Sequence, residues 1–256
     1  MEINLIGFDI LLGRKKPENI IQHTNTCPFC DRKHLTNIID TEDDMILLRN
    51  KYNVLDHADQ FVLIEGRACK EDMPSYTPEH MHALIRFGTR HWFRMLNSEL
   101  YKSVLFFKNY GPLSGGTMRH PHMQIIGFHD IDDHLMYDPK DFIGLPIHEK
   151  NGVQLNISTR PRIGFGEFNI VPESNEAVDT VADYIQIVVD YLMHHFSKRC
   201  RSYNIFFYCE QGLMRVKIMP RFATSPLFIG YNIHFRPNNL ENIVENVQQI
   251  YFNTHK

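Results

Sequence analysis

The sequence predicts an α+β protein in which one structural unit is used twice. Two stretches of the chain, about 100 residues apart, show the same order of strand, helix, strand and strand. Short sequences match between them: FVLIEG with FNIVPE, SVLFFKNYG with YNIFFYCEQG, and MQIIGF with VKIMPR. The alternative interpretation is two unrelated segments with a similar order of elements.

The first copy begins with a short apolar strand, which we expect at 61–65. A helix follows at 77–97, with a threonine that can cap it and a proline at its first position. The apolar residues of this helix recur at spacings of three and four, which indicates one buried face. A strand at 103–108, a glycine-rich loop and a strand at 122–128 complete the copy.

The second copy repeats this order with the same spacing of apolar residues. We expect a strand at 165–171, an amphipathic helix at 175–197, and two strands at 203–209 and 213–219. A glutamine–glycine turn joins the last two strands.

The boundary between the copies is predicted from composition. The stretch 138–152 is rich in proline, glycine and charged residues, which is typical of a linker. We therefore expect one unit over 1–145 and a second over 146–256. A last amphipathic helix is expected at 238–252.

Composition excludes several classes of protein. Hydrophobic residues make up 43% and charged residues 22% of the 256 residues, which is the balance of a globular protein. A formal net charge of −3 disfavours a nucleic-acid partner. There is no apolar run near the length that crosses a bilayer, and the N-terminal stretch does not resemble a signal peptide. We expect a cytoplasmic protein without a membrane partner.

The five cysteines, an odd number, argue against a disulfide framework. Cys27 and Cys30 form a C-x-x-C pair, which in a reducing compartment indicates metal or redox chemistry. An oxidoreductase is the weaker interpretation, because no thioredoxin-like βαβ pattern surrounds Cys27.

The strongest chemical signal is the stretch NYGPLSGGTMRHPHMQIIGF at 109–128. On a strand His120, His122 and Gln124 share one face, and the apolar residues between them face a core. The adjacent loop is rich in glycine, so its backbone can approach an anion closely. An imidazole beside such a loop is positioned to attack phosphorus. The alternative is a solvated strand face whose histidines have no role.

The second copy has lost this pattern. When IIG is aligned with IMP, Leu213, Arg215 and Lys217 stand where the first copy has its two histidines and glutamine. We therefore expect one chemically active copy, with the other serving as scaffold or contributing contacts.

These features resemble the galactose-1-phosphate uridylyltransferase branch of the histidine-triad superfamily, and within it a short bacterial group. The motif elements are Asn109, the loop Gly115–Thr117 and the H-P-H-x-Q sequence that ends at Gln124. The resemblance covers most of 20–130; over 150–256 mainly the element order and MPRFAT are similar. It implies two tandem histidine-triad-like units, each an antiparallel sheet with a packed helix.

The resemblance also implies a structural zinc ion. Cys27, Cys30 and His120 match three of the family's ligands, and Cys69 stands where the family has a histidine. A Cys₃His set is an ordinary tetrahedral zinc site. His34 is a rival fourth ligand, and Cys69 would then be a loop cysteine without a partner.

The remaining roles are likewise implied by the resemblance. His122 would attack the α-phosphorus of a nucleoside diphosphate sugar and form a nucleotidyl-histidine. Gln124 would hold a non-bridging phosphate oxygen. Substrate binding would fall to Asn50, Asn109, Gly115, Gly116 and Thr117. A basic cluster at 14–16 could meet phosphate, but we interpret it as a solvated face.

Our first functional hypothesis is a nucleotidyltransferase or phosphorylase that acts on a nucleotide sugar or related dinucleotide with a phosphate-bearing acceptor. A hydrolase with the same nucleophile, and a zinc-stabilised nucleotide-binding protein without turnover, are the alternatives. Asn53 and Val54 depart from the family pattern, so the base stays open. A homodimer is expected by analogy alone.

Overall fold

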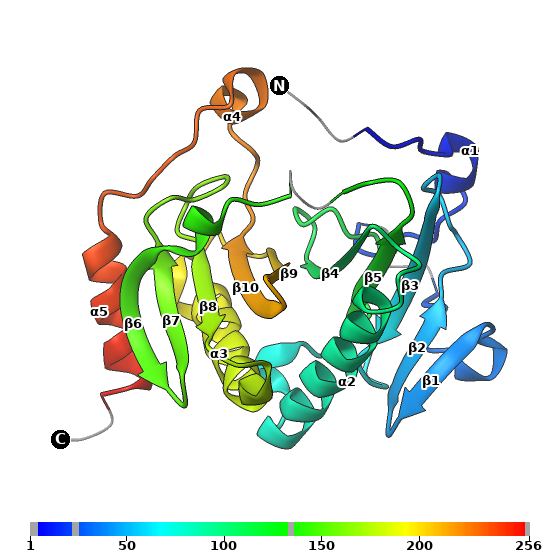
Figure 1. Ribbon diagram of the computed structural model, residues 1–256, viewed down its shortest axis with the longest axis horizontal. Helices are drawn as coiled ribbons and strands as arrows, with labels where there is room; N and C mark the ends of the chain where they lie inside the picture. Colours follow the sequence, from blue (N-terminus) through cyan, green and yellow to red (C-terminus); the bar gives the residue numbers. More distant parts are fainter. Residues whose placement is uncertain (1–4, 22–25, 133–135, 254–256) are drawn as a thin grey trace.

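Ten strands form one continuous antiparallel sheet in the computed structural model, which describes residues 5–21, 26–132 and 136–253 (Figure 1). The strand order is β1-β2-β3-β5-β4-β9-β10-β8-β7-β6. Each half of the chain supplies five neighbouring strands. The expected α+β architecture of two tandem units is therefore confirmed, and the two units share one sheet.

The first half contains the elements that carry the H-P-H-x-Q stretch and the C-x-x-C pair. Its short N-terminal helix is α1 (Ile10–Gly13). Its strands and long helix are β1 (Ile38–Glu42), β2 (Met45–Arg49), β3 (Ala58–Ile64), α2 (Pro78–Leu96), β4 (Ser103–Tyr110) and β5 (His122–Phe128). Thr77 caps α2 by accepting a hydrogen bond from the backbone N–H of His80 at 3.3 Å, as the sequence predicts.

The second half repeats this order and then continues with two helices. Its strands and long helix are β6 (Gly144–Lys150), β7 (Val153–Ser158), β8 (Phe168–Pro172), α3 (Val178–Tyr191), β9 (Tyr203–Glu210) and β10 (Leu213–Pro220). A π-helical turn, Leu192–Phe196, extends α3. The chain then forms α4 (Pro226–Tyr231) and α5 (Leu240–Tyr251).

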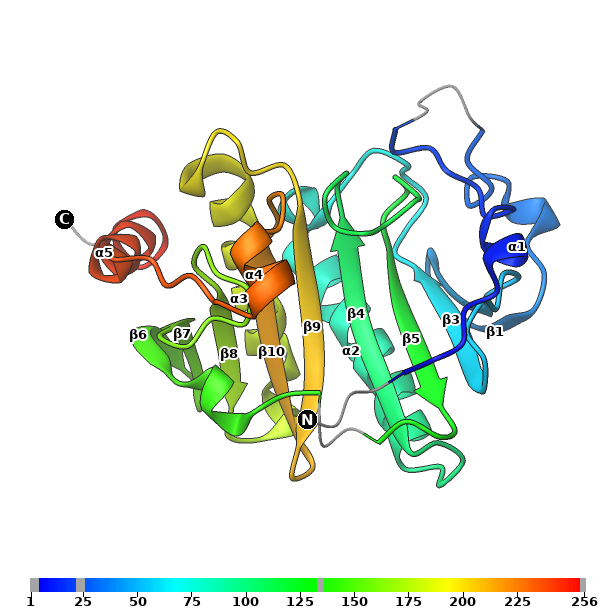
Figure 2. The same cartoon turned by 90° about the horizontal axis from the view of Figure 1, so that it is seen from above.

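The two units meet where β4 pairs with β9, at the centre of the sheet (Figure 2). Phe107 is paired with Phe206 across this junction. In each unit this phenylalanine also faces the aligned position of the next strand, which is Gln124 in the first unit and Lys217 in the second. The pairing therefore supports the alignment of the two copies.

The hydrophobic core lies between the sheet and the two long helices, which pack against each other on one face. Phe106 of β4 and Phe207 of β9 stack at 4.3 Å between ring centroids, and Trp92 of α2 packs against both. Because side chains alternate along a strand, Phe107 and Phe206 face the opposite side of the sheet. The two long helices therefore cover one face of the sheet, and loops lie on the opposite face.

The predicted linker at 138–152 is wrong in its main part. Residues 144–150 form β6, the edge strand of the second unit, which pairs with β7. Its proline and charged residues are tolerated because an edge strand exposes one side to solvent. Asn151 and Gly152, with φ of 52° and 69°, form the hairpin turn. The division into units at residues 145 and 146 stays a prediction.

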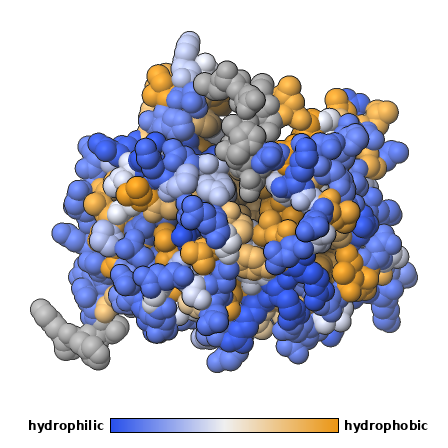
Figure 3. Space-filling model, viewed as in Figure 1, coloured by the Kyte–Doolittle hydropathy of each residue, from blue (hydrophilic) through white to orange (hydrophobic). Residues whose placement is uncertain are grey.

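Apolar side chains are exposed on the two short helices, near the top of the view in Figure 3. On α1 these are Ile10 and Leu11, and on α4 they are Leu227 and Ile229. No helix in the described part of the chain combines the length and the apolar character needed to span a membrane. The homodimer stays a prediction.

Candidate active site and metal centre

Four predicted metal ligands converge beside the start of β5. The ligand atoms of Cys27, Cys30, Cys69 and His120 all lie within 4.8 Å of one another. The sulfurs of Cys27 and Cys30 are 3.6 Å and 3.5 Å from His120 Nδ1. Tetrahedral zinc, with bonds of about 2.3 Å to sulfur and 2.0 Å to nitrogen, separates such atoms by about 3.5 Å. The cluster thus fits a metal ion, in keeping with zinc.

His120 is oriented as a metal ligand. Its Nε2 lies 3.0 Å from the backbone carbonyl of Gly66, so that nitrogen donates a hydrogen bond and Nδ1 keeps its lone pair toward the sulfurs. His34 lies outside this cluster: its side chain is 81% exposed and bonds to Asp31 at 2.8 Å. The geometry therefore favours Cys69 over His34 as the fourth ligand.

Two cysteines of the cluster, Cys27 and Cys30, hold their protons tightly when no cation balances them. Burial raises the pKa of the Cys30 thiol to about 12, with the neighbouring Cys69 and Cys27 adding to the effect. The pKa of Cys27 is raised as well, mainly by burial. Cys27 and Cys30 resist ionisation mainly because burial disfavours the thiolate, and the neighbouring sulfurs add to this effect. A bound divalent cation would reverse this balance.

His122 begins β5 next to the cluster and is only 7% exposed. Its Nδ1 lies 2.8 Å from the backbone carbonyl of His120, so Nδ1 carries the hydrogen and Nε2 has the free lone pair. Burial lowers the pKa of His122 to about 4, so the ring is neutral at neutral pH. The edge of Phe29 packs on it at 5.5 Å between centroids.

The glycine-rich loop that precedes β5 has an unusual backbone. Gly115 has φ of +86°, a conformation that side chains with a Cβ rarely adopt. Gly116 packs so closely on Asn109 that an added Cβ would lie 3.3 Å from the Cβ of that asparagine. The hydroxyl of Ser114 donates to the carbonyl of Gly111 at 2.7 Å and tightens the turn. The loop is therefore held in one compact form.

A cavity of about 900 Å³ lies between the loop, β5 and the strands of the first unit. It is lined by both residues predicted to be catalytic and by all five predicted to bind substrate: His122, Gln124, Asn50, Asn109, Gly115, Gly116 and Thr117. His120 lies in the metal cluster instead. One surface thus collects residues that are up to about 70 positions apart in the chain.

The cavity also has walls that the sequence did not indicate. Lys16 lines it, whereas we expected the basic cluster at 14–16 to be a solvated face; burial lowers the pKa of Lys16. Phe29, Tyr52 and Phe107 supply aromatic surface. Phe29 stands between the two cysteines of the C-x-x-C pair, a position that could have suggested packing against the histidines.

Buried charges lie behind β4, on the helix side of the sheet. Lys108 forms ion pairs with Glu65 and, at 3.4 Å, with Asp72. Tyr203 of β9 donates to Asp72 at 2.7 Å, and Tyr76 donates to Glu65 at 3.1 Å. Burial raises the pKa of Asp72. This network ties the segment after β3, which carries Cys69, to the second unit.

Solved structures with the same fold include enzymes. A crystal structure of an ADP-glucose phosphorylase from Arabidopsis thaliana with bound ADP-glucose matches with a TM-score of 0.68 at 15% identity, over 93% of each chain. A uridylyltransferase matches with a TM-score of 0.68 at 14% identity, over 95% of this chain and 97% of that one. At these identities the likeness shows the fold alone.

One curated protein also shares sequence with this chain. A di-/tripeptide transporter from Lactobacillus helveticus is 28% identical over 102 residues, which are 40% of this chain and 20% of the transporter. The match thus spans about a fifth of that protein's length.

A much closer likeness links the chain to a family. A crystal structure of a DUF4931 family protein from Bacillus cereus is 40% identical, with a TM-score of 0.75 over 83% of this chain and 98% of that one. The domain of unknown function (DUF4931) N-terminal domain matches residues 8–131, and the corresponding C-terminal domain matches residues 134–252. The chain therefore belongs to the DUF4931 family, and it has the fold of the uridylyltransferase and the ADP-glucose phosphorylase.

Proposed function

We propose that this protein is a nucleotidyltransferase that acts on a nucleoside diphosphate sugar or a related dinucleotide. The observation that carries the proposal is His122, a neutral imidazole whose Nε2 lone pair is free in a cavity that also contains the glycine-rich loop. Nucleophilic catalysis needs an unprotonated nitrogen held in a fixed orientation. The backbone carbonyl of His120 supplies that orientation.

The proposed reaction has two displacements at one phosphorus atom. In the first, His122 Nε2 forms a bond to the α-phosphorus, the bond from that phosphorus to the bridging oxygen breaks, and the sugar phosphate leaves with the electron pair. In the second, an oxygen of a phosphate-bearing acceptor forms a bond to the same phosphorus. The phosphorus–nitrogen bond then breaks and returns the lone pair to His122.

The charge on the phosphoryl group would be met by groups that already line the cavity. Gln124 has an amide N–H₂ that would donate to a non-bridging oxygen, and the backbone N–H groups of Gly115–Thr117 would face the diphosphate. The ammonium of Lys16 would add a positive charge at the rim. Asn50 and the aromatic side chain of Tyr52 would meet the nucleoside.

Zinc would have a structural role in this proposal. It would be held by Cys27, Cys30, Cys69 and His120, which fit it by geometry. Fixing His120 would also fix the carbonyl that orients His122, and fixing the C-x-x-C turn would hold Phe29 against the imidazole.

The fold adds support of a general kind. ADP-glucose was bound in the Arabidopsis thaliana phosphorylase, a protein with this fold. A nucleotide sugar is therefore a reasonable first substrate class for the cavity, whereas the base, the sugar and the acceptor are open.

The test is a search for the covalent intermediate. Zinc-loaded protein is incubated separately with ADP-glucose, UDP-glucose, UDP-galactose and diadenosine polyphosphates, and intact-mass spectrometry is used to find an acid-labile nucleotidyl adduct. We expect the adduct in the wild type and in His194→Ala, a control at an exposed histidine outside the cavity, and not in His122→Ala. Discharge by phosphate or a sugar phosphate supports transfer, and discharge by water alone indicates a hydrolase. Tight nucleotide binding without any adduct would contradict the proposal and favour a binding protein.

A further inference from the structure

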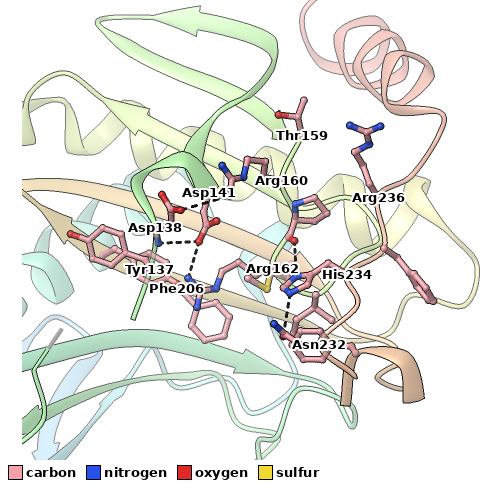
Figure 4. A pocket seen from close by; sticks show the side chains of 16 residues that line it. Tyr137, Asp138, Asp141, Thr159, Arg160, Arg162, Phe206, Asn232, His234 and Arg236 are labelled. Carbon is pink, nitrogen blue, oxygen red and sulfur yellow. Dashed lines mark hydrogen bonds and ion pairs between the residues drawn. The ribbon is translucent and has the colours of Figure 1, made fainter. Parts of the chain in front are cut away.

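The second unit contains a cavity of its own, of about 940 Å³ (Figure 4). Its floor includes Phe206 and Tyr208 of β9 and Met219 of β10. Its walls come from the loop after β7 and from the segment after α4. We call it the second cavity, and the one that contains His122 the first cavity.

The two cavities occupy corresponding places in the duplicated fold. Phe107 lines the first cavity and Phe206 lines the second, and these residues are paired across the β4–β9 junction. Their ring centroids are 6.4 Å apart. The cavities therefore lie on the same face of the sheet, on either side of one pair of rings.

Cationic side chains are the main polar feature of the second cavity. Arg162 is bound to Asp141 at 3.0 Å, and Arg160 is 3.7 Å from Asp138, a loose contact between half-exposed groups. Arg236 has no hydrogen bond or ion pair with any residue that the structure describes. Two guanidinium groups are therefore available to an anion, and arginine binds phosphate oxygens in pairs.

The loop that carries Arg160 and Arg162 is held in place by a buried carboxylate. Glu167 is fully buried and accepts hydrogen bonds from the backbone N–H groups of Arg162, Ile163 and Gly164 at 2.8, 2.7 and 3.2 Å. The buried ammonium of Lys217 lies 3.4 Å from the same carboxylate. Lys217 is the counterpart of Gln124, so the second unit uses this position to build the wall of its cavity.

The second cavity has no histidine with a free ring nitrogen among its described lining residues. Arg215, the counterpart of His122, is bound to Glu210 at 2.8 Å and to the carbonyl of Pro172 at 2.8 Å. The histidine of the lining, His234, has an oxygen near each ring nitrogen: the Pro161 carbonyl at 3.2 Å and Asn232 Oδ1 at 3.3 Å (Figure 4). The cavity therefore lacks the free imidazole nitrogen that the first cavity has, which favours binding over transfer.

We propose that the second cavity binds a phosphate-bearing ligand of the nucleotide class without reacting with it. Arg160 and Arg236 would contact the phosphate oxygens. The base would lie against the aromatic side chains of the cavity, where Phe206, Phe228 and Phe235 are available for stacking. This inference is independent of turnover in the first cavity.

The test counts binding sites by isothermal titration of the zinc-loaded protein with ADP. We expect two sites in the wild type. In the double variant Arg160→Gln/Arg236→Gln, affinity at one site should fall at least tenfold, because two charge-assisted contacts to the phosphate are lost. Gln124→Ala should instead weaken the other site. Arg94→Gln, a control at an exposed arginine of α2, should change neither.

Other outcomes would overturn the inference. A single ADP site that is insensitive to the double variant would do so, as would two sites that both retain their affinity in it. Titration with inorganic pyrophosphate tests the aromatic part: equal affinity for pyrophosphate and ADP would exclude the nucleotide class. If two sites are found and His122 forms no adduct, the second cavity stands while the proposed function fails.

Discussion

Asn204 of the second unit holds Asn109 of the first: its side-chain amide donates a hydrogen bond to Asn109 Oδ1 at 2.6 Å. The same amide donates to the carbonyl of Ser114 at 3.0 Å, and Arg221 donates to Asn204 Oδ1 at 2.7 Å. The unit that lacks the histidines therefore supports the glycine-rich loop of the unit that has them. Asn204 is 1% exposed, so these bonds form in the interior.

Replacing Asn204 should slow the proposed transfer without removing the nucleophile. In Asn204→Ala the loop carbonyl and Asn109 lose their donor, and a buried bond of this kind is worth about 1–3 kcal/mol. We expect adduct formation to slow by roughly tenfold, because a poorly positioned loop stabilises the transition state less well. Single-turnover kinetics would measure this. Asn204→Asp retains the acceptor for Arg221 and should be equally slow; a normal rate in it would contradict the role of the donated bond.

The metal cluster can be tested through its least expected ligand. Cys69→Ser should weaken zinc binding strongly, because a hydroxyl is a poor replacement for a thiolate. We expect about one zinc per chain in the wild type and a loss of metal in the variant during dialysis against a mild chelator. Metal analysis by mass spectrometry gives the readout. Cys200→Ser, at a cysteine far from the cluster in the chain, should retain its zinc; equal retention in both variants would exclude Cys69 as a ligand.

The sequence predicted the central part of the fold from local patterns. Most residues of the candidate site followed from the family resemblance, and the structure places them in one cavity and one cysteine–histidine cluster. The two long helices follow the spacing of apolar residues, and the strands of each copy follow short apolar runs. The edge strands β1 and β6 were missed because an edge strand has one solvated side: β6 reads as polar, although Asn151-Gly152 is a strong hairpin signal. Their inner neighbours β2 and β7 were missed as well, although both are largely buried. Lys16 and Asn204 could not be predicted, because only the tertiary fold brings them to the loop.

The buried ion network should contribute strongly to stability. Lys108→Met would leave Glu65 and Asp72 buried without their cation, and breaking such a pair costs about 3–5 kcal/mol. Urea unfolding measures the change in the free energy of unfolding. Lys102→Met, at an exposed lysine at the start of the same hairpin, should change it by less than about 0.5 kcal/mol. Similar values for the two variants would show that the network has little effect.

A substitution at Gly115 can separate the effect of the loop on protein stability from its effect on adduct formation. An alanine there meets no neighbouring atom but is strained by the positive φ, at a cost of about 1–3 kcal/mol. Gly212→Ala is the matched control, because Gly212 has φ of +82° and equally open surroundings, in the turn between β9 and β10. Both variants should lose similar stability in urea unfolding. Only Gly115→Ala should slow adduct formation, and equal rates in the two would separate the loop from the reaction.

The buried imidazole of His122 predicts a defined dependence of stability on pH. Its pKa is about 4 in the folded protein, mainly because of burial, and about 6.5 when the chain is unfolded. Between these values the unfolded chain binds a proton that the folded chain does not. The free energy of unfolding therefore falls as pH decreases from 6.5 to 4, by about 3 kcal/mol from this group.

His122→Asn isolates this contribution, because both proteins contain the same cysteine cluster and the other titrating groups cancel in the difference. The stability of the wild type relative to the variant should be constant above pH 7, decline between pH 6.5 and 4, and level off below, as urea unfolding at a series of pH values would show. Parallel curves for the two proteins would mean that His122 titrates equally in both states. The imidazole of His122 would then not be desolvated in the folded protein, and burial would not explain why it is neutral inside the cavity.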